Sequence, residues 1–194
     1  MTAELPIASV TAILKNILEN ELVRRMVSST VGTDVIVSAL PPDRITVGAD
    51  ERTQLNLFFY QAKPNMRLHA PDWESRNETP GSRPLTLELH YLVTAYSAQE
   101  LHAEVLLSHA LRIFQETSTL NQDAFEKRLA AIVRGNERKG ELLSSPTDRS
   151  SRVEQITIRP QFLPTEEMSR LWSALQAPFR PSVAYKVTVV TNDD

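Results

Sequence analysis

Four histidines are the residues of this 194-residue chain with the widest chemical scope, because imidazole binds metal ions and transfers protons near neutral pH. His102 and His109 are seven residues apart, a spacing that puts them on one face of a helix. No third ligand completes them at a metal-binding spacing, and the same holds for His69 and His90. We therefore expect structural or surface histidines, with no metal site and no cofactor.

The sequence offers no better candidates for acid–base or nucleophilic catalysis than for metal binding. Glu166 and Glu167 form a carboxylate pair, but adjacent helical residues point about 100° apart, and two carboxylates suit the positive end of a helix. The sequence has neither a His-Glu-x-x-His nor a Gly-x-Ser-x-Gly motif, and it has no phosphate-cradling glycine loop. The absence of cysteine excludes disulfides, thiolate ligands and a cysteine nucleophile. We predict that the protein is not an enzyme.

The charge distribution argues against nucleic-acid and membrane partners. The formal net charge is −3, so the chain has no basic footprint for nucleic acid. Basic residues between 134 and 152 alternate with acidic ones, which is typical of a solvated loop. No apolar run approaches ~18 residues, and the N-terminus lacks the pattern of a signal peptide. We expect a protein made in the cytoplasm.

One long strand at 84–97 organises the elements that position these residues. Its odd positions form an almost wholly apolar face, and its even positions are mixed. The alternation runs over ~12 residues, against about five or six in a usual strand. Ser97 and Glu100 have the spacing of a capping box, which predicts a helix that follows and covers the strand. The odd positions are Leu85, Leu87, Leu89, Tyr91, Val93 and Ala95.

The other periodicities predict an α+β fold in a single domain, residues 1–194. We expect a mainly antiparallel sheet of four to six strands, with three or four helices packed on one side. Asn121 and Thr165 are predicted helix caps. The predicted helices span 7–27, 101–114, 124–133 and 165–175, and the predicted strands span 35–40, 44–47, 55–60, 153–159 and 182–190.

Two long connections interrupt this pattern, at 61–83 and 135–152. Loops beyond ~12–15 residues in a compact domain are usually functional or mobile, so both are expected to be mobile. Trp73 lies in the first connection and is either an anchor on the domain or an interface residue.

The long strands carry a surplus of apolar and aromatic residues, such as Phe58 and Tyr60, on both faces. A protein with such faces and no active site is often an assembly subunit, although a two-layer core without a partner is equally compatible. The strand at 182–190 lies near the C-terminus, and we predict that it is an edge strand able to pair with a neighbouring chain.

Three segments together resemble the DUF4255 family, the amino-terminal domain of the cap protein of contractile phage-tail-like injection systems. Their order and spacing carry the resemblance, and the starting helix around Val10–Leu14 and Leu18–Asn20 fits it. The segments are Leu55–Asn65, Arg83–Tyr96 and Met168–Tyr185.

This resemblance implies a phage tail-terminator-like fold and a structural role. Such proteins form a ring, usually a hexamer, on the last layer of the inner tube and the contractile sheath. The ring closes the end distal to the baseplate and fixes tail length. The implied partners are other copies of the chain, the inner tube protein and the sheath protein, within a particle that can be released from the cell.

The predicted contact residues form two groups. Phe58, Tyr60 and Trp73 are assigned to a ring contact, and the 182–190 strand is assigned to the sheath. Two alternatives stay open: a baseplate or collar adaptor of the same machine, and a non-catalytic small-molecule-binding domain. The contact residues in the strand are Tyr185, Lys186, Val187, Thr188, Val189 and Val190.

Overall fold

The structure is a computed structural model that describes residues 7–64, 85–135, 143 and 152–192. Helices and strands alternate irregularly along the chain. In chain order they are α1 (Ile7–Arg24), α2 (Val27–Val31), β1 (Ile36–Ser38), the 3₁₀ helix η1 (Pro42–Arg44), β2 (Gln54–Pro64), β3 (Leu85–Tyr96), α3 (His102–Glu116), β4 (Thr119–Asn121), α4 (Gln122–Gly135), β5 (Arg152–Gln161), α6 (Thr165–Ala174) and β6 (Ser182–Asn192).

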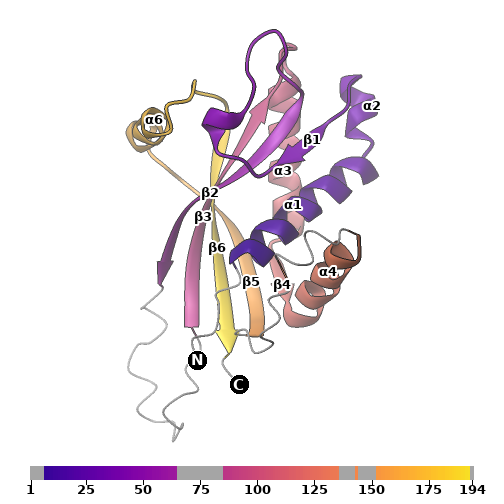
Figure 1. Cartoon of the computed structure of the whole chain (residues 1–194), viewed down its shortest axis with the longest axis vertical. Coiled ribbons are helices and arrows are strands. Elements are labelled where there is room, and N and C mark those ends of the chain that lie inside the picture. The colour runs from indigo at the N-terminus through magenta and orange to yellow at the C-terminus, as the bar shows by residue number, and fades with distance from the viewer. Residues whose placement is uncertain (1–6, 65–84, 136–142, 144–151, 193–194) are drawn as a thin grey trace, which may run out of the picture.

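The six strands form one curled, mixed sheet in the order β1-β2-β3-β6-β5-β4 (Figure 1). β1 pairs with β2 in parallel, and the other four pairings are antiparallel. The long strands β2, β3, β6 and β5 build the body of the sheet. The predicted α+β class with a mainly antiparallel sheet is therefore confirmed.

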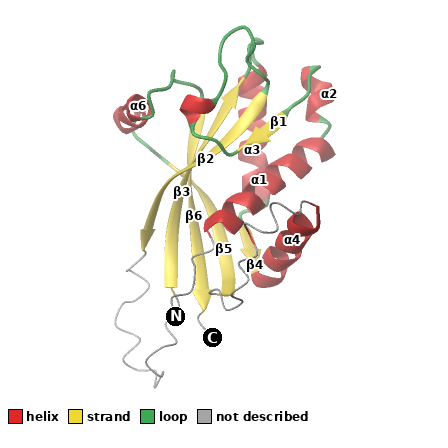
Figure 2. Cartoon of the chain, in the orientation of Figure 1, coloured by secondary structure: helices red, strands yellow, loops and turns green. Residues whose placement is uncertain are grey.

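β3 is a central strand whose apolar positions face a layer of helices, as predicted. We call this side of the sheet the first face. It bears Leu87, Leu89, Tyr91, Val93 and Ala95, each at most 4% exposed. The α1, α2, α3 and α4 helices lie on this side (Figure 2), and their residues form one core cluster with these side chains.

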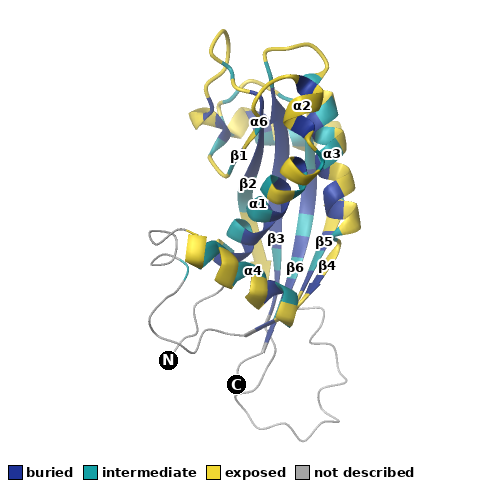
Figure 3. Cartoon of the chain, turned by 90° about the vertical axis from the view of Figure 1, so that its right-hand side faces the viewer, coloured by how far each residue is buried: buried dark blue, intermediate teal, exposed yellow. Residues whose placement is uncertain are grey.

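The helices bury stripes that their sequences set out at steps of three and four residues. Figure 3 shows the strands behind these helices mostly in dark blue and exposed, yellow segments on the helices in front of them. The Tyr91 hydroxyl lies 2.9 Å from Thr11 Oγ1 of α1, so the buried phenol has a hydrogen-bond partner. The buried apolar residues of α1 and α3 are Val10, Ile13, Leu14, Ile17, Leu18, Leu22, Leu106, Ala110, Ile113 and Phe114.

One helix lies on the opposite side of the sheet, which we call the second face. Leu92 and Tyr96 of β3 and Ala184 of β6 point to this side and form a smaller cluster with Ile45 and Trp172 of α6. The prediction that all helices share one side is wrong for α6. The physical reason is that β3 carries large apolar side chains at even positions too, and burying them needs a second cover.

The start of α3 differs from the predicted capping box. The helix begins at His102, and the preceding Leu101 has a left-handed backbone (φ 65°) and no side-chain cap. Ser97 Oγ instead accepts a hydrogen bond from the Gln99 backbone N–H at 3.1 Å. The Ser97 hydroxyl therefore hydrogen-bonds the backbone of a local turn. Such local hydrogen bonds compete with the use of a serine as a helix cap.

Other helix boundaries are partly confirmed. Asn121 caps α4, since its Oδ1 accepts a hydrogen bond from the Ala124 N–H at 3.0 Å. Thr165 is the first residue of α6, and Pro164 occupies the cap position without a side-chain hydrogen bond. The predicted 7–27 helix breaks at Met26, where φ is 51° and α2 begins. The predicted strand at 44–47 is absent from the described residues, which have the end of η1, a bend at Ile45 and no regular structure at 46–47.

β2 is longer than predicted, because β3 offers it a partner over its whole length. Residues 61–64, assigned to a connection from the sequence, pair with β3 from Gln61 opposite His90 to Pro64 opposite Leu87. The register shifts at a bulge between Phe59 and Gln61. Proline is tolerated at the end of a strand, which explains why Pro64 does not stop the pairing earlier.

Candidate interaction surfaces

The predicted free edge at 182–190 is wrong, because β6 lies inside the sheet. β6 pairs with β3 on one side and with β5 on the other, so its backbone groups already have partners. Proximity to the chain end does not determine the position of a strand in a sheet. Strand addition at β6 would require the displacement of a neighbour.

The six residues assigned to that strand divide between the two faces. Tyr185, Val187 and Val189 lie in the main core at 3% exposure or less. Lys186, Thr188 and Val190 alternate with them on the second face and are half-buried. Only this second set is placed to meet a partner without unfolding, and its role in binding stays a prediction.

Phe58 and Tyr60 also lie toward the second face. Phe58 is half-buried opposite Leu92. Tyr60 stands at the bulge, contacts the His90 ring with centroids 5.9 Å apart, and packs on the smaller cluster. Burial raises the pKa of Tyr60 above its usual value.

Several predicted features lie outside the described residues. Trp73 and His69 are among them. So are residues 65–83 of the first predicted connection and residues 136–142 and 144–151 of the second.

The part of the second face away from α6 is polar. Lys186 Nζ lies 3.3 Å from Glu88 Oε1, and His90 Nδ1 lies 2.7 Å from Gln161 Oε1. The strand registers place Lys63 beside Glu88 and Arg159 beside Lys186 on the same face. Three cationic side chains and one carboxylate therefore share this surface, which gives it a positive balance.

The sheet edges differ in how much they are covered. β1 pairs only with Gln54–Asn56 of β2, so Leu57–Pro64 has a strand partner on one side only within the described residues. At the other edge, β4 covers three residues of β5. Unpaired backbone along the outer side of β2 is the kind of edge at which a strand from another chain can add.

An ion pair fastens the α6 segment to the second face. Arg180 Nη2 donates to Glu51 Oε2 at 2.7 Å, and the Glu51 side chain is 4% exposed. The Arg180 guanidinium also lies over the Tyr96 ring, 6.0 Å from its centroid. Burial raises the pKa of Tyr96 to about 12. Glu51 lies just before β2 and Arg180 just before β6, so this ion pair links the two segments that lead into these strands.

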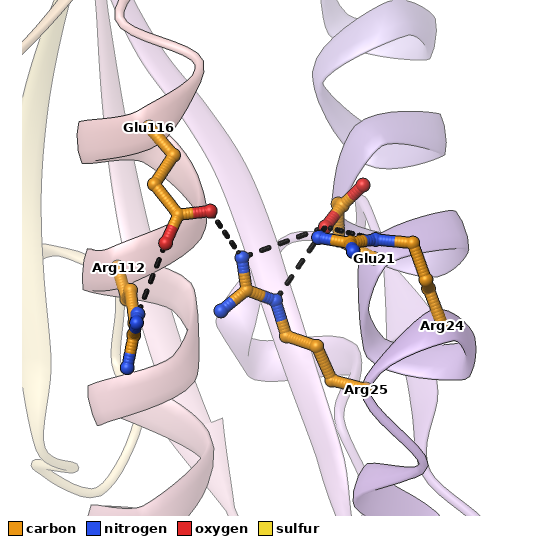
Figure 4. Close-up of polar contacts among 5 residues, drawn as sticks. All are labelled: Glu21, Arg24, Arg25, Arg112 and Glu116. Atoms are coloured by element: carbon orange, nitrogen blue, oxygen red, sulfur yellow. Dashed lines mark hydrogen bonds and ion pairs between the residues drawn. The ribbon is translucent and has the colours of Figure 1, made fainter.

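A second charged network joins α1 to α3 on the other side of the molecule (Figure 4). Glu21 accepts hydrogen bonds from Arg24 at 2.6 and 2.9 Å. Glu116 pairs with Arg25 at 2.5 Å and with Arg112 at 3.0 Å. The hydrogen bonds from Arg24 lower the pKa of Glu21, and those from Arg112 and Arg25 lower the pKa of Glu116.

The residues considered for catalysis do not converge. His102 and His109 lie on α3, while His90 lies on the second face of the sheet. Burial, Arg25 and Arg112 lower the pKa of His109. Across the described residues, no group of three histidine, aspartate or glutamate side chains is arranged to hold a metal ion. None of the described helices has the length and apolar content to cross a membrane.

Among the described residues, five apolar side chains are more than 60% exposed, which the sequence analysis did not predict; Leu101, at 65%, precedes α3, and the other four lie at two places in the fold. These four are Phe162 at 87%, Val23 at 78%, Met26 at 69% and Phe179 at 62% exposed. Phe162 and Phe179 flank α6, and Val23 and Met26 flank the junction of α1 and α2. The nearby Pro164 and Pro178 were a signal for the first two, because they mark turns at which an aromatic side chain has little room to be covered.

The described part of the chain defines a class of α+β domain with a six-stranded curled sheet, four α-helices on one face and α6 on the other. The profile of the family described as Pvc16 N-terminal domain matches residues 9–194. The chain belongs to this family, which agrees with the resemblance drawn from the sequence. No curated protein matches the sequence.

Two solved structures share the fold. One is the sheath/tube terminator of an extracellular contractile injection system, PVC, in its extended state: TM-score 0.56, 16% identity, covering 100% of this chain and 58% of that one. The other is the tube-terminating cap of the anti-feeding prophage: TM-score 0.50, 16% identity, covering 89% of this chain and 53% of that one. This chain therefore spans little more than half the length of either. The expected terminator-like fold is confirmed.

Proposed function

We propose that this chain acts as a cap, or tail terminator, of a contractile phage-tail-like injection particle. It closes the end of the inner tube and sheath distal to the baseplate and fixes tail length. The family match over residues 9–194 is the observation that carries the proposal. The fold shared with a sheath/tube terminator and with a tube-terminating cap supports it.

The role is structural and needs neither a cofactor nor catalysis. The chain assembles with copies of itself into a ring, a homohexamer, which contacts the inner tube protein and the sheath protein. Assembly takes place in the cytoplasm, and the finished particle is released. A closed ring needs two different patches on each subunit, since identical patches would stop at a dimer.

The second face is the surface that we assign to the tube or sheath. It presents Phe58 and Tyr60 beside the half-buried side chains of Lys186, Thr188 and Val190. From the sequence, Phe58, Tyr60 and Trp73 were assigned to a ring contact; we now propose that Phe58 and Tyr60 face the tube or sheath, and Trp73 stays a predicted ring-contact residue. The cations Lys63 and Arg159 lie on the same face, so charge complementarity favours an acidic partner surface. The outer edge of β2 takes over the strand-pairing role first assigned to β6.

The experiment is co-assembly of tube, sheath and baseplate components with and without this chain, followed by electron microscopy. We expect rings at the end distal to the baseplate and a narrow length distribution only when the chain is present. Rings at the baseplate end would instead identify an adaptor. No association with tube or sheath would overturn the proposal and favour a small-molecule-binding domain.

Charge reversal on the second face sharpens this experiment. The double variant Arg159→Glu, Lys186→Glu is expected to lose capping while it still folds. Lys127→Glu, at an exposed position of α4 on the other side of the sheet, is the matched control and should cap normally. Equal capping by both variants would remove the second face from the proposed contact.

A further inference from the structure

Among the described residues, five apolar side chains are more than 60% exposed; Leu101 stands alone, and the other four lie at two places in the fold. Single exposed apolar residues are ordinary on a protein surface, whereas paired ones beside charged groups indicate a contact site. Val23 and Met26 lie at the junction of α1 and α2, and Phe162 and Phe179 flank α6. We call their surroundings the junction patch and the flap patch.

The junction patch combines the apolar pair with a basic balance. Met26 has a left-handed backbone at φ 51°, a conformation that long side chains rarely adopt, and its side chain is 69% exposed. Arg24 lies between the two apolar residues with its side chain 66% exposed. In the network of Figure 4, three arginines meet two glutamates, which leaves one net positive charge.

The flap patch combines its apolar pair with an acidic balance. Phe179 contacts the Trp172 ring with centroids 5.7 Å apart, so it is held in place while most of its surface stays exposed. The first turn of α6 carries Glu166 and Glu167, and Glu166 pairs with Arg170 at 2.5 Å. Two carboxylates and one guanidinium leave one net negative charge.

The two patches lie on opposite sides of the molecule. α6 packs on the second face, and α1 and α2 pack on the first. Figure 1 shows α6 at the left and the α1–α2 junction at the right, both toward the upper end of the long axis. Because the patches lie on opposite sides of one copy, the flap patch of one copy can meet the junction patch of a neighbour, and a chain of such contacts can close into a ring.

We propose that the flap patch of one copy docks on the junction patch of the next, and that this head-to-tail contact builds the ring. The inference rests on the proposed function for the ring itself. It assigns the contact to a second copy because apolar pairs meet apolar pairs and the charge balances are opposite. A contact between two different patches is heterologous, so it closes into a ring or continues as a filament.

Site-specific cross-linking tests the contact directly, since the sequence has no cysteine. The Val23→Cys and Phe162→Cys variants, carrying tags of different size, are mixed at high protein concentration with a short bis-maleimide. We expect a cross-linked heterodimer. Each variant keeps the other apolar residue of its patch, so the contact survives the substitution.

The matched control pairs Val23→Cys with Leu101→Cys, a leucine that is 65% exposed and belongs to neither patch. A heterodimer yield several-fold above this control supports the contact. A yield equal to the control overturns it. Cross-linking of Val23→Cys with itself in preference to the mixture also overturns it, because that would indicate an isologous contact.

A second variant separates this inference from the proposed function. Phe162→Ser with Phe179→Ser changes exposed side chains, so the fold should be retained, as checked by circular dichroism. We expect this variant to lose rings. If the wild-type chain caps tails and this variant caps equally well, the contact is wrong and the capping role stands. If the cross-link forms but the wild type does not cap, the capping role is wrong and the contact stands.

Discussion

The two faces of the sheet differ in how many apolar side chains they bury and in how well their buried polar atoms are hydrogen-bonded. Within the described residues, the cluster on the first face contains 28 buried apolar residues from the sheet and its four helices. The cluster on the second face contains five. Within the described residues, five buried polar atoms on or beside the second face have no hydrogen-bond partner. These are Glu51 Oε1, His90 Nε2, Tyr96 Oη, Trp172 Nε1 and Arg180 Nε.

This difference teaches which side stabilises the fold and which side is available for assembly. Burial of apolar surface is the main source of stability, so most of the stability comes from the first face. Buried polar groups without partners cost free energy and are usually satisfied by water or another molecule. Covering the second face by a partner would therefore satisfy more polar groups than covering the first face, and would disturb less of the buried core.

The largest expected effect comes from alkaline pH, which acts on both faces. Burial raises the pKa of Tyr185 on the first face to about 12, and that of Tyr96 on the second to the same value. It also raises the pKa of Tyr91 and Tyr60. In the unfolded chain the pKa of a tyrosine is about 10. The stability that these buried, neutral tyrosines contribute is thus fully present below pH ~10. It is lost as the pH rises through about 12.

Tyrosinate absorbance and circular dichroism, followed together from neutral to alkaline pH, check this prediction. The two signals should change together, because ionisation accompanies unfolding. Full ionisation of the tyrosines near pH about 10, with circular dichroism unchanged, would contradict it.

A matched pair of substitutions on β3 compares the faces next. Leu89 and Leu92 are both fully buried, the first on the helix-covered face and the second under α6. Leu89→Ala is expected to lower the free energy of unfolding by about 4 kcal/mol, and Leu92→Ala by about 2 kcal/mol, since α6 can settle into the space. Denaturant unfolding measures both. Equal losses would show that the second cluster is as rigid as the main core.

The smallest effect is expected from the ion pair that fastens α6. Glu51→Gln should cost about 1–2 kcal/mol, because it leaves the Arg180 charge without its partner, while partial exposure of Arg180 limits the loss. Hydrogen exchange should become faster in α6 and stay unchanged in α3. Glu166→Gln, in an exposed pair of the same helix, is the control and should have almost no effect.

Some of the fold follows from local pattern. The alternation from Leu85 to Tyr96 predicted β3, and the three- and four-residue steps from Val10 to Leu22 predicted α1, because each period matches one backbone geometry. Asn121 was predicted as a cap for a local reason as well. The same logic failed at Ser97, whose hydroxyl accepts from the Gln99 N–H, and at Thr165, which is the first residue of α6 instead of its cap.

The candidate surfaces were harder to predict, because they depend on neighbours distant in sequence. Phe58 and Tyr60 were singled out as aromatics on a strand with two covered faces, and their positions toward the second face agree with that reading. Val23 and Phe162 follow ordinary helix and strand patterns, and only the packed structure shows that nothing described covers them.

The sequence by itself determined the class of fold, the central strand, the main helices and the family, since these rest on periodicity and on ordered motifs along the chain. Tertiary structure alone decided that β6 lies between β3 and β5, that α6 covers the second face, and which apolar side chains remain exposed. The reason is physical: strand order and exposure are set by long-range pairing and packing, and many arrangements satisfy the same local pattern equally well.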